Sequence, residues 1–104
     1  MSEQVRVLVY HAAASPCLVD DAYHQVSTKL VGVPGMLGNE LLHSLPDPTG
    51  FLVVSRWASI EAFTQWEQGP AHLDTTAPLR PFRDPRMTTP FGIYRVTAAY
   101  SKDH

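Results

Sequence analysis

Two hydrophobic periods alternate along this chain, and their order constrains its fold more than any other feature. Apolar residues recur at every second position in some segments, as in β-strands, and at every third or fourth position in others, as in helices. The predicted elements, in chain order, are a strand over residues 4–12, a helix over 16–31, strands over 35–44 and 51–57, helices over 59–68 and 71–79, and a strand over 91–100. This order is the split βαβ, ferredoxin-like arrangement. We therefore predict an α+β fold with a four-stranded antiparallel sheet and helices on one face.

The predicted strands are apolar on both faces, so one face of the sheet needs cover that the helices cannot provide. In the first strand Val5, Val7 and Val9 alternate with Leu8 and Tyr10. An exposed apolar face of this kind usually meets a partner. A second copy of the same sheet would cover it, and we predict a two-fold homodimer through the sheet face.

Serine and proline mark the boundaries of the helices. Ser15-Pro16 predicts a helix start, with serine as the N-cap and proline in the first turn. Ser59 is predicted to cap the second helix. Four prolines fall within residues 78–90, and they predict a stiff loop without regular structure.

Composition and charge exclude several classes of protein. The 104 residues fit one domain, residues 1–104, and carry eight Lys or Arg against ten Asp or Glu, a net charge of −2. The basic residues form no run, so nucleic acid is not a predicted partner. No apolar run approaches the ~20 residues of a membrane span. The single cysteine, Cys17, precludes an internal disulfide, and we expect a cytoplasmic protein.

Three sequence segments, the last of them the predicted terminal strand, carry a family resemblance. The corner VPGM is followed, after the strand FLVVSRW, by the pattern W-x-S-x-E-A-F-x-x-W over residues 57–66. Together they resemble the antibiotic biosynthesis monooxygenase family, and the similarity extends from Val5 to Tyr100. The resemblance implies a dimeric α+β barrel. One branch of that family contains cofactor-independent monooxygenases that convert polyketide anthrones to quinones with dioxygen, and another contains haem-degrading monooxygenases.

The resemblance to the polyketide branch implies an apolar site for a hydrophobic aromatic molecule between helices and sheet. His43, at the end of the second strand, is the predicted catalytic base, and a solvated strand-end histidine is the alternative. The predicted substrate-binding residues are Trp66, His72, Tyr23, Tyr94 and Arg80. The alternative interpretation is that the aromatic members of this set are core residues, His72 caps a turn, and Arg80 is a solvated surface group.

Cofactor predictions depend on which branch applies. No glycine-rich phosphate loop follows a strand and the five histidines show no metal-ligand spacing, so neither a cofactor nor a metal is predicted. The haem branch is the alternative, but its first-strand asparagine is absent because Asn39 is the first asparagine in the chain. Thr75 and Thr76 stand where its histidine would lie, with His72 nearby. The polyketide branch has an asparagine where this chain has Val53, which leaves a third alternative, a dimer that binds an aromatic ligand without chemistry.

Overall fold

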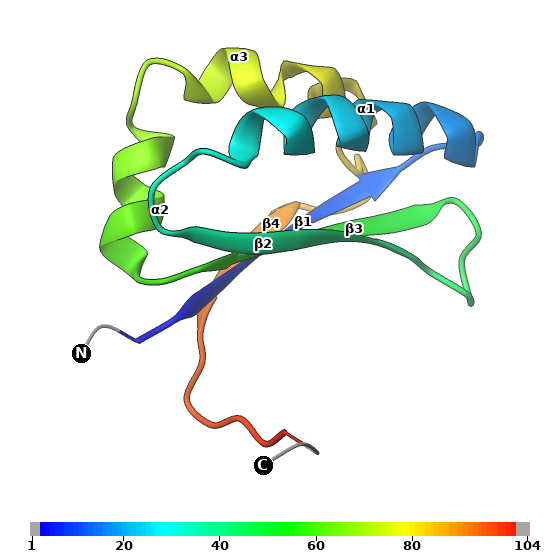
Figure 1. Cartoon of the computed structure of the whole chain (residues 1–104). Coiled ribbons are helices and arrows are strands. Elements are labelled where there is room, and N and C mark those ends of the chain that lie inside the picture. The colour runs from blue at the N-terminus through cyan, green and yellow to red at the C-terminus, as the bar shows by residue number, and fades with distance from the viewer. Residues whose placement is uncertain (1–2, 102–104) are drawn as a thin grey trace.

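The computed structural model describes residues 3–101, and its sheet has the strand order β2-β3-β1-β4 with antiparallel neighbours (Figure 1). The elements in chain order are β1 (Val5–Ala12), α1 (Pro16–Leu30), β2 (Met36–His43), β3 (Gly50–Trp57), α2 (Ile60–Glu67), α3 (His72–Thr76), the 3-10 helix η1 (Ala77–Phe82) and β4 (Phe91–Arg95). The helices lie on one side of the sheet (Figure 1). The predicted ferredoxin-like α+β fold is confirmed.

Two predicted boundaries are wrong. The predicted helix over 71–79 is α3 followed by η1, and η1 extends to Phe82, into the segment predicted to lack regular structure. Pro78 is tolerated because it lies in the first turn of η1, where a proline's missing N–H costs no helical hydrogen bond. The last strand ends at Arg95 instead of residue 100. Arg95 pairs with Val5, the first residue of β1, so β4 has no strand beside it beyond that point.

The corner before β2 is tied to α2. Gly35 has a φ of +84°, and a Cβ there would meet the side chain of Ala62 on α2. Ser59 caps α2 as predicted, and its hydroxyl oxygen accepts a hydrogen bond from the backbone N–H of Ala62 at 3.1 Å. Ser15 occupies the N-cap position of α1 but makes no side-chain cap bond.

A β-bulge in β2 decides which way that strand's side chains face. Met36 pairs with Trp57 and Gly38 with Arg56, so Leu37 is an extra residue in the strand. Beyond the bulge the alternation is reversed, and His43 lies on the helix-covered side of the sheet.

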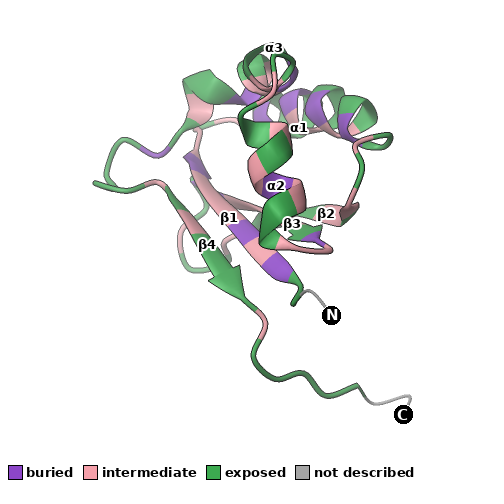
Figure 2. Ribbon diagram, turned by 90° about the vertical axis from the view of Figure 1, so that its left-hand side faces the viewer, coloured by how far each residue is buried: buried purple, intermediate pink, exposed green. Residues whose placement is uncertain are grey.

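The core lies between the helices and the inner face of the sheet, and the outer face has no helix over it. Figure 2 shows the buried positions gathered on the inward sides of α1 and β1. The inner face contributes Val5, Val7, Phe51 and Trp57, all at most 5% exposed. None of the helices described within residues 3–101 has the length and hydropathy needed to cross a membrane.

Candidate functional site

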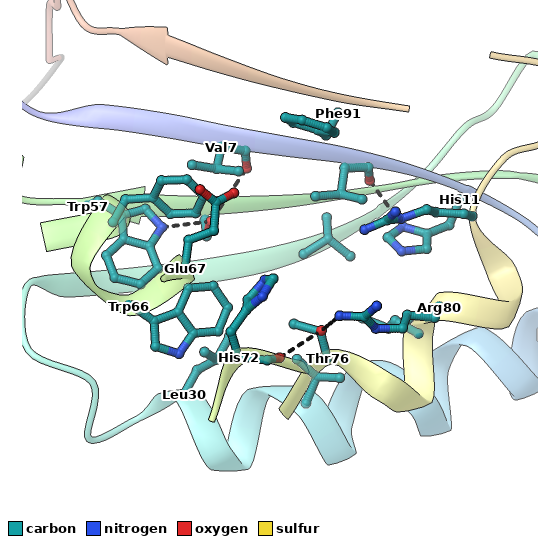
Figure 3. A pocket seen from close by; sticks show the side chains of 17 residues that line it. Val7, His11, Leu30, Trp57, Trp66, Glu67, His72, Thr76, Arg80 and Phe91 are labelled. Atoms are coloured by element: carbon teal, nitrogen blue, oxygen red, sulfur yellow. Dashed lines mark hydrogen bonds between the residues drawn. The ribbon is translucent and has the colours of Figure 1, made fainter. Parts of the chain in front are cut away.

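A cavity of about 140 Å³ lies between the inner face of the sheet and the helices (Figure 3). Its walls are mostly apolar. The lining side chains that the site uses come from β1, β3, α2, α3, η1 and β4, and they include Val7, His11, Trp57, Trp66, Glu67, His72, Thr76, Arg80, Arg83 and Phe91. An apolar cavity of about this size accepts a benzene ring. The space therefore matches one aromatic ring, with further rings left to lie at the mouth.

Aromatic rings form one end of the cavity. Trp57 donates a hydrogen bond from Nε1 to Ser55 Oγ at 2.9 Å, which fixes the plane of its indole. Trp66 stacks against Trp57 with centroids 5.5 Å apart, and His72 stands edge-on to Trp66 at 4.7 Å. Two predicted binding residues, Trp66 and His72, are therefore brought together in this cavity. The family resemblance predicted both residues correctly, because Trp66 lies on α2 and His72 follows only a short turn later in the sequence.

His11 is a cavity residue that the sequence analysis did not select. It is only 3% exposed, and its Nδ1 lies 3.1 Å from the carbonyl oxygen of Val9, which it is placed to donate to. Every fully buried side-chain nitrogen or oxygen in residues 3–101 has a hydrogen-bond partner. Nε2 of His11 has no such partner, so this atom is not fully buried. The His11 ring borders this cavity and a second hollow beside it.

Burial lowers the pKa of His11, and the positive charge of Arg83 lowers it further, against the raising effect of the bond to Val9. The imidazole is thus neutral at pH 7, with Nε2 free to accept a proton. The sequence signal for this residue was available, because His11 continues the inward series of Val5, Val7 and Val9.

Cationic groups flank the cavity at its mouth. Arg80 donates from Nη2 to Thr76 Oγ1 at 3.0 Å, and Thr76 donates in turn to the backbone oxygen of His72 at 2.9 Å. Desolvation and Arg80 lower the pKa of His72, and this second imidazole is also neutral at pH 7. Arg80, a predicted binding residue, lines the cavity as expected for that role, and Arg83 joins it from the end of η1.

His43, the predicted base, does not line this cavity. It is exposed and lines a second hollow with Tyr10, Asp84 and Arg86, and His11 borders both this hollow and the cavity. Its Nε2 lies 2.8 Å from the carbonyl oxygen of Pro48, and its ring stacks on Phe51 with centroids 4.4 Å apart. A proton on Nε2 donates to Pro48 and leaves Nδ1 as the acceptor nitrogen, so what sets His43 apart is its position outside the cavity.

Neither predicted tyrosine lines the cavity. Tyr23 donates its hydroxyl to the side-chain oxygen of Asn39, where Ser27 also donates, and so ties α1 to β2. Tyr94 pairs with Arg6 on the outer face of the sheet and is 59% exposed.

The described residues form no cluster of metal ligands. Among residues 3–101, no three His, Cys, Asp or Glu side chains gather closely enough to hold a metal ion.

Sequence comparison finds relatives in Streptomyces. The chain is 33% identical over 78 residues to Protein SchA of Streptomyces halstedii, covering 75% of this chain and 20% of that protein. It is 34% identical over 77 residues to Polyketide synthase CurD of Streptomyces cyaneus, covering 74% of this chain and 20% of that protein. The chain thus spans about one fifth of the length of these curated relatives.

Structural comparison supports the same fold. SnoaB of Streptomyces nogalater, a cofactor-independent oxygenase, has a TM-score of 0.75 at 15% identity, with 100% of both chains covered. A conserved protein from Methanosarcina mazei has a TM-score of 0.69 at 16% identity, covering 89% of this chain and 92% of that one. The family model for antibiotic biosynthesis monooxygenase matches residues 18–77, more than half of the 104 residues. The resemblance is confirmed, and the chain belongs to the antibiotic biosynthesis monooxygenase family.

Proposed function

We propose that this protein is a cofactor-independent monooxygenase that oxidises an aromatic, polyketide-type substrate with dioxygen. The observation that carries the proposal is His11, a buried imidazole that lines a largely apolar cavity and uses Nδ1 for its bond to Val9. The likeness to a cofactor-independent oxygenase and to a polyketide synthase supports it. We assign the base to His11 in place of His43, because His11 lines the cavity and His43 does not.

The chemistry needs one base and an apolar space. Neutral His11 takes a proton from an acidic CH₂ group beside the aromatic ring, leaving a carbanion. The carbanion passes one electron to dioxygen, and the substrate radical and superoxide combine to form a peroxide anion. The imidazolium returns its proton to the peroxide, and loss of water leaves a carbonyl, so CH₂ and O₂ become C=O and H₂O. The protein contributes orientation and stabilisation of the anion.

The size of the cavity limits how a polycyclic substrate binds. The innermost ring points toward Trp66 and His72, the reacting CH₂ lies beside His11, and the remaining rings lie against Phe91 and Ile93. These two side chains face the helix side of the edge strand β4 and are 42% and 41% exposed. They offer an apolar shelf for rings that do not fit inside.

We also propose that the protein acts as a homodimer through the outer face of the sheet. The paired residues Leu8 with Val54 and Tyr10 with Leu52 form an apolar surface there, on the side away from the helices (Figure 1). Sedimentation velocity at micromolar concentration should give a dimer, and Val54→Lys should give a monomer. A monomeric wild type would refute this part of the proposal.

The test of activity is an assay of metal-free protein with an anthrone under air. Quinone formation and oxygen uptake should exceed the spontaneous rate and should fall with His11→Gln. His43→Gln is the matched control, since it removes a histidine on the same face of the sheet outside the cavity. A rate no higher than spontaneous oxidation would refute the oxygenase.

Two alternatives give different outcomes in the same preparation. A non-catalytic aromatic-binding dimer would bind the anthrone with no turnover, and His11→Gln would then change affinity alone. A haem protein would show a Soret shift on haem titration, which we do not expect because the first-strand asparagine and the histidine of the haem branch are both missing here.

A further inference from the structure

The charged groups around the cavity are divided between its two ends. Glu67 is the carboxylate among the lining residues, and it lies beside Trp57 and Val7 in Figure 3. Arg80 lies at the other end of the same view, below His11. Arg83 follows η1 and forms an isolated β-bridge with His11, so it belongs to the Arg80 end. A ligand in the cavity therefore meets positive charge at one end.

Neither cavity arginine is neutralised within the described residues. Arg86 pairs with Asp84 and Asp47, and Arg95 pairs with Glu3, all within 3.2 Å. Within residues 3–101, by contrast, Arg80 and Arg83 form no ion pair. Two uncompensated guanidinium groups beside an apolar cavity favour an anionic group on whatever enters it.

One hydrogen bond orients the exposed side chain of Arg80. Its Nη2 donates to Thr76 Oγ1, which is itself held by the carbonyl of His72 one helical turn earlier. This anchor uses one of the five N–H donors of the guanidinium and leaves the others for a ligand. Burial is the main cause of the lowered pKa of both cavity histidines. Arg80 lowers the pKa of His72 further while Glu67 raises it, and Arg83 lowers the pKa of both His72 and His11.

We propose that the cavity selects an aromatic ligand that carries a carboxylate, with the carboxylate bound by Arg80 and Arg83 at the mouth and the ring directed toward Trp66. This orientation keeps the anion away from Glu67 and brings the reacting ring past Nε2 of His11. The inference rests on the proposed function in that the carboxylate belongs to the substrate. Planar guanidinium groups bind carboxylates in a two-pronged geometry, which gives direction as well as affinity.

The experiment measures binding without reaction. Anthracene carboxylate and its neutral counterpart anthracene methanol are titrated into the protein by calorimetry at low ionic strength. The acid should bind about tenfold more tightly than the alcohol, the ratio expected for one charged hydrogen bond at its lower limit. Arg80→Gln and Arg83→Gln should each remove most of this preference and leave the affinity for the alcohol unchanged. Physiological salt should weaken binding of the acid alone.

Arg95→Gln is the matched control, because it removes the same charge from β4 at a position that does not line the cavity. Arg83→Glu should reverse the preference toward the alcohol, and circular dichroism would show that each variant is folded. Equal affinity for acid and alcohol in the wild type would overturn the proposal. So would a loss of preference in Arg95→Gln as large as in Arg80→Gln.

The binding experiment separates this inference from the proposed function. If the acid is preferred but no anthrone is oxidised, the oxygenase fails and the ligand class stands. If a neutral anthrone is oxidised and the acid has no advantage, the oxygenase stands and the carboxylate site is refuted.

Discussion

Two histidines occupy one cross-strand row of the sheet and have opposite surroundings. His11 on β1 and His43 on β2 both pair with Phe51 of β3, one on each side. His11 is 3% exposed, lines the cavity and has a free Nε2, whereas His43 is exposed with Nε2 held by Pro48. The same residue type, on the same face and in the same row, is a cavity group in one strand and a surface group in the other.

The difference comes from what covers each strand. β1 is a central strand, and the segment after η1 passes over its end: Asp84 donates its backbone N–H to Tyr10 at 3.1 Å, and Arg83 bridges to His11. β2 is an edge strand, and the turn after it folds back so that Pro48 meets His43. Cover from a segment about seventy residues away in sequence, rather than the strand itself, makes a histidine a buried base.

The largest expected effect separates the two histidines by activity. His11→Gln should lower kcat for anthrone oxidation by roughly 10²–10⁴-fold, the usual contribution of a general base. His43→Gln should change kcat by less than about twofold, because that ring touches no part of the cavity. Steady-state oxygen uptake measures both. Equal losses in the two variants would refute the assignment of the base to His11.

The next largest effect is on stability and comes from removing the ring of Phe51, which lies between the two histidines. Phe51→Ala should lower the free energy of unfolding by about 3–5 kcal/mol, because Phe51 is 5% exposed in the main core cluster. Urea denaturation followed by tryptophan fluorescence gives this value. Phe51→Leu, which keeps most of the volume, should cost less than half as much, and an equal cost would show that packing is not the cause.

A smaller effect appears as pH dependence of stability. The pKa of His11 is lowered in the folded protein, so between that value and about 6.5 the unfolded chain binds a proton that the folded chain does not. Stability should therefore rise with pH through this window and fall as the solution is acidified. His11→Gln should remove that part of the acid sensitivity, and His43→Gln should leave it. Denaturation at a series of pH values tests both, and an unchanged slope in His11→Gln would contradict the prediction.

The smallest effect is on the exposed histidine itself. His43→Ala loses a stacking contact with Phe51 and one hydrogen bond to Pro48, both at the surface. We expect a loss of about 1 kcal/mol or less in the free energy of unfolding. A loss above about 3 kcal/mol would mean that His43 is part of the core after all.

Much of the site was predictable where it depends on local order. The pattern that begins at Trp57 fixed α2, and with it Trp66 and His72 in the cavity. The alternation of side chains along the strands also indicates which residues face the cavity. It sets His11 inward with Val9, and it sets Tyr94 on the face opposite Phe91 and Ile93. Tyr94 was expected at the cavity although the parity of its own strand directs it outward.

Other parts of the site could not be read from local patterns. The bulge at Leu37 reverses the alternation of β2, so the facing of His43 depends on pairing with β3. Tyr23 looked free to line a cavity, but Asn39 from that same strand takes its hydroxyl. No local sequence pattern indicated that Arg83 lies beside His11, because this contact arises from the path of the chain after η1.

The sequence by itself determined the element order, the sheet topology and the inward face of the central strands, because hydrophobic period and turn residues act over a few positions. The tertiary structure alone decided which histidine is buried, which face β2 presents after its bulge, and which arginines meet at the cavity. The burial and the charge of a site depend on segments that are distant from one another in the sequence. They exist only once β1, η1 and the residues that follow it have packed together.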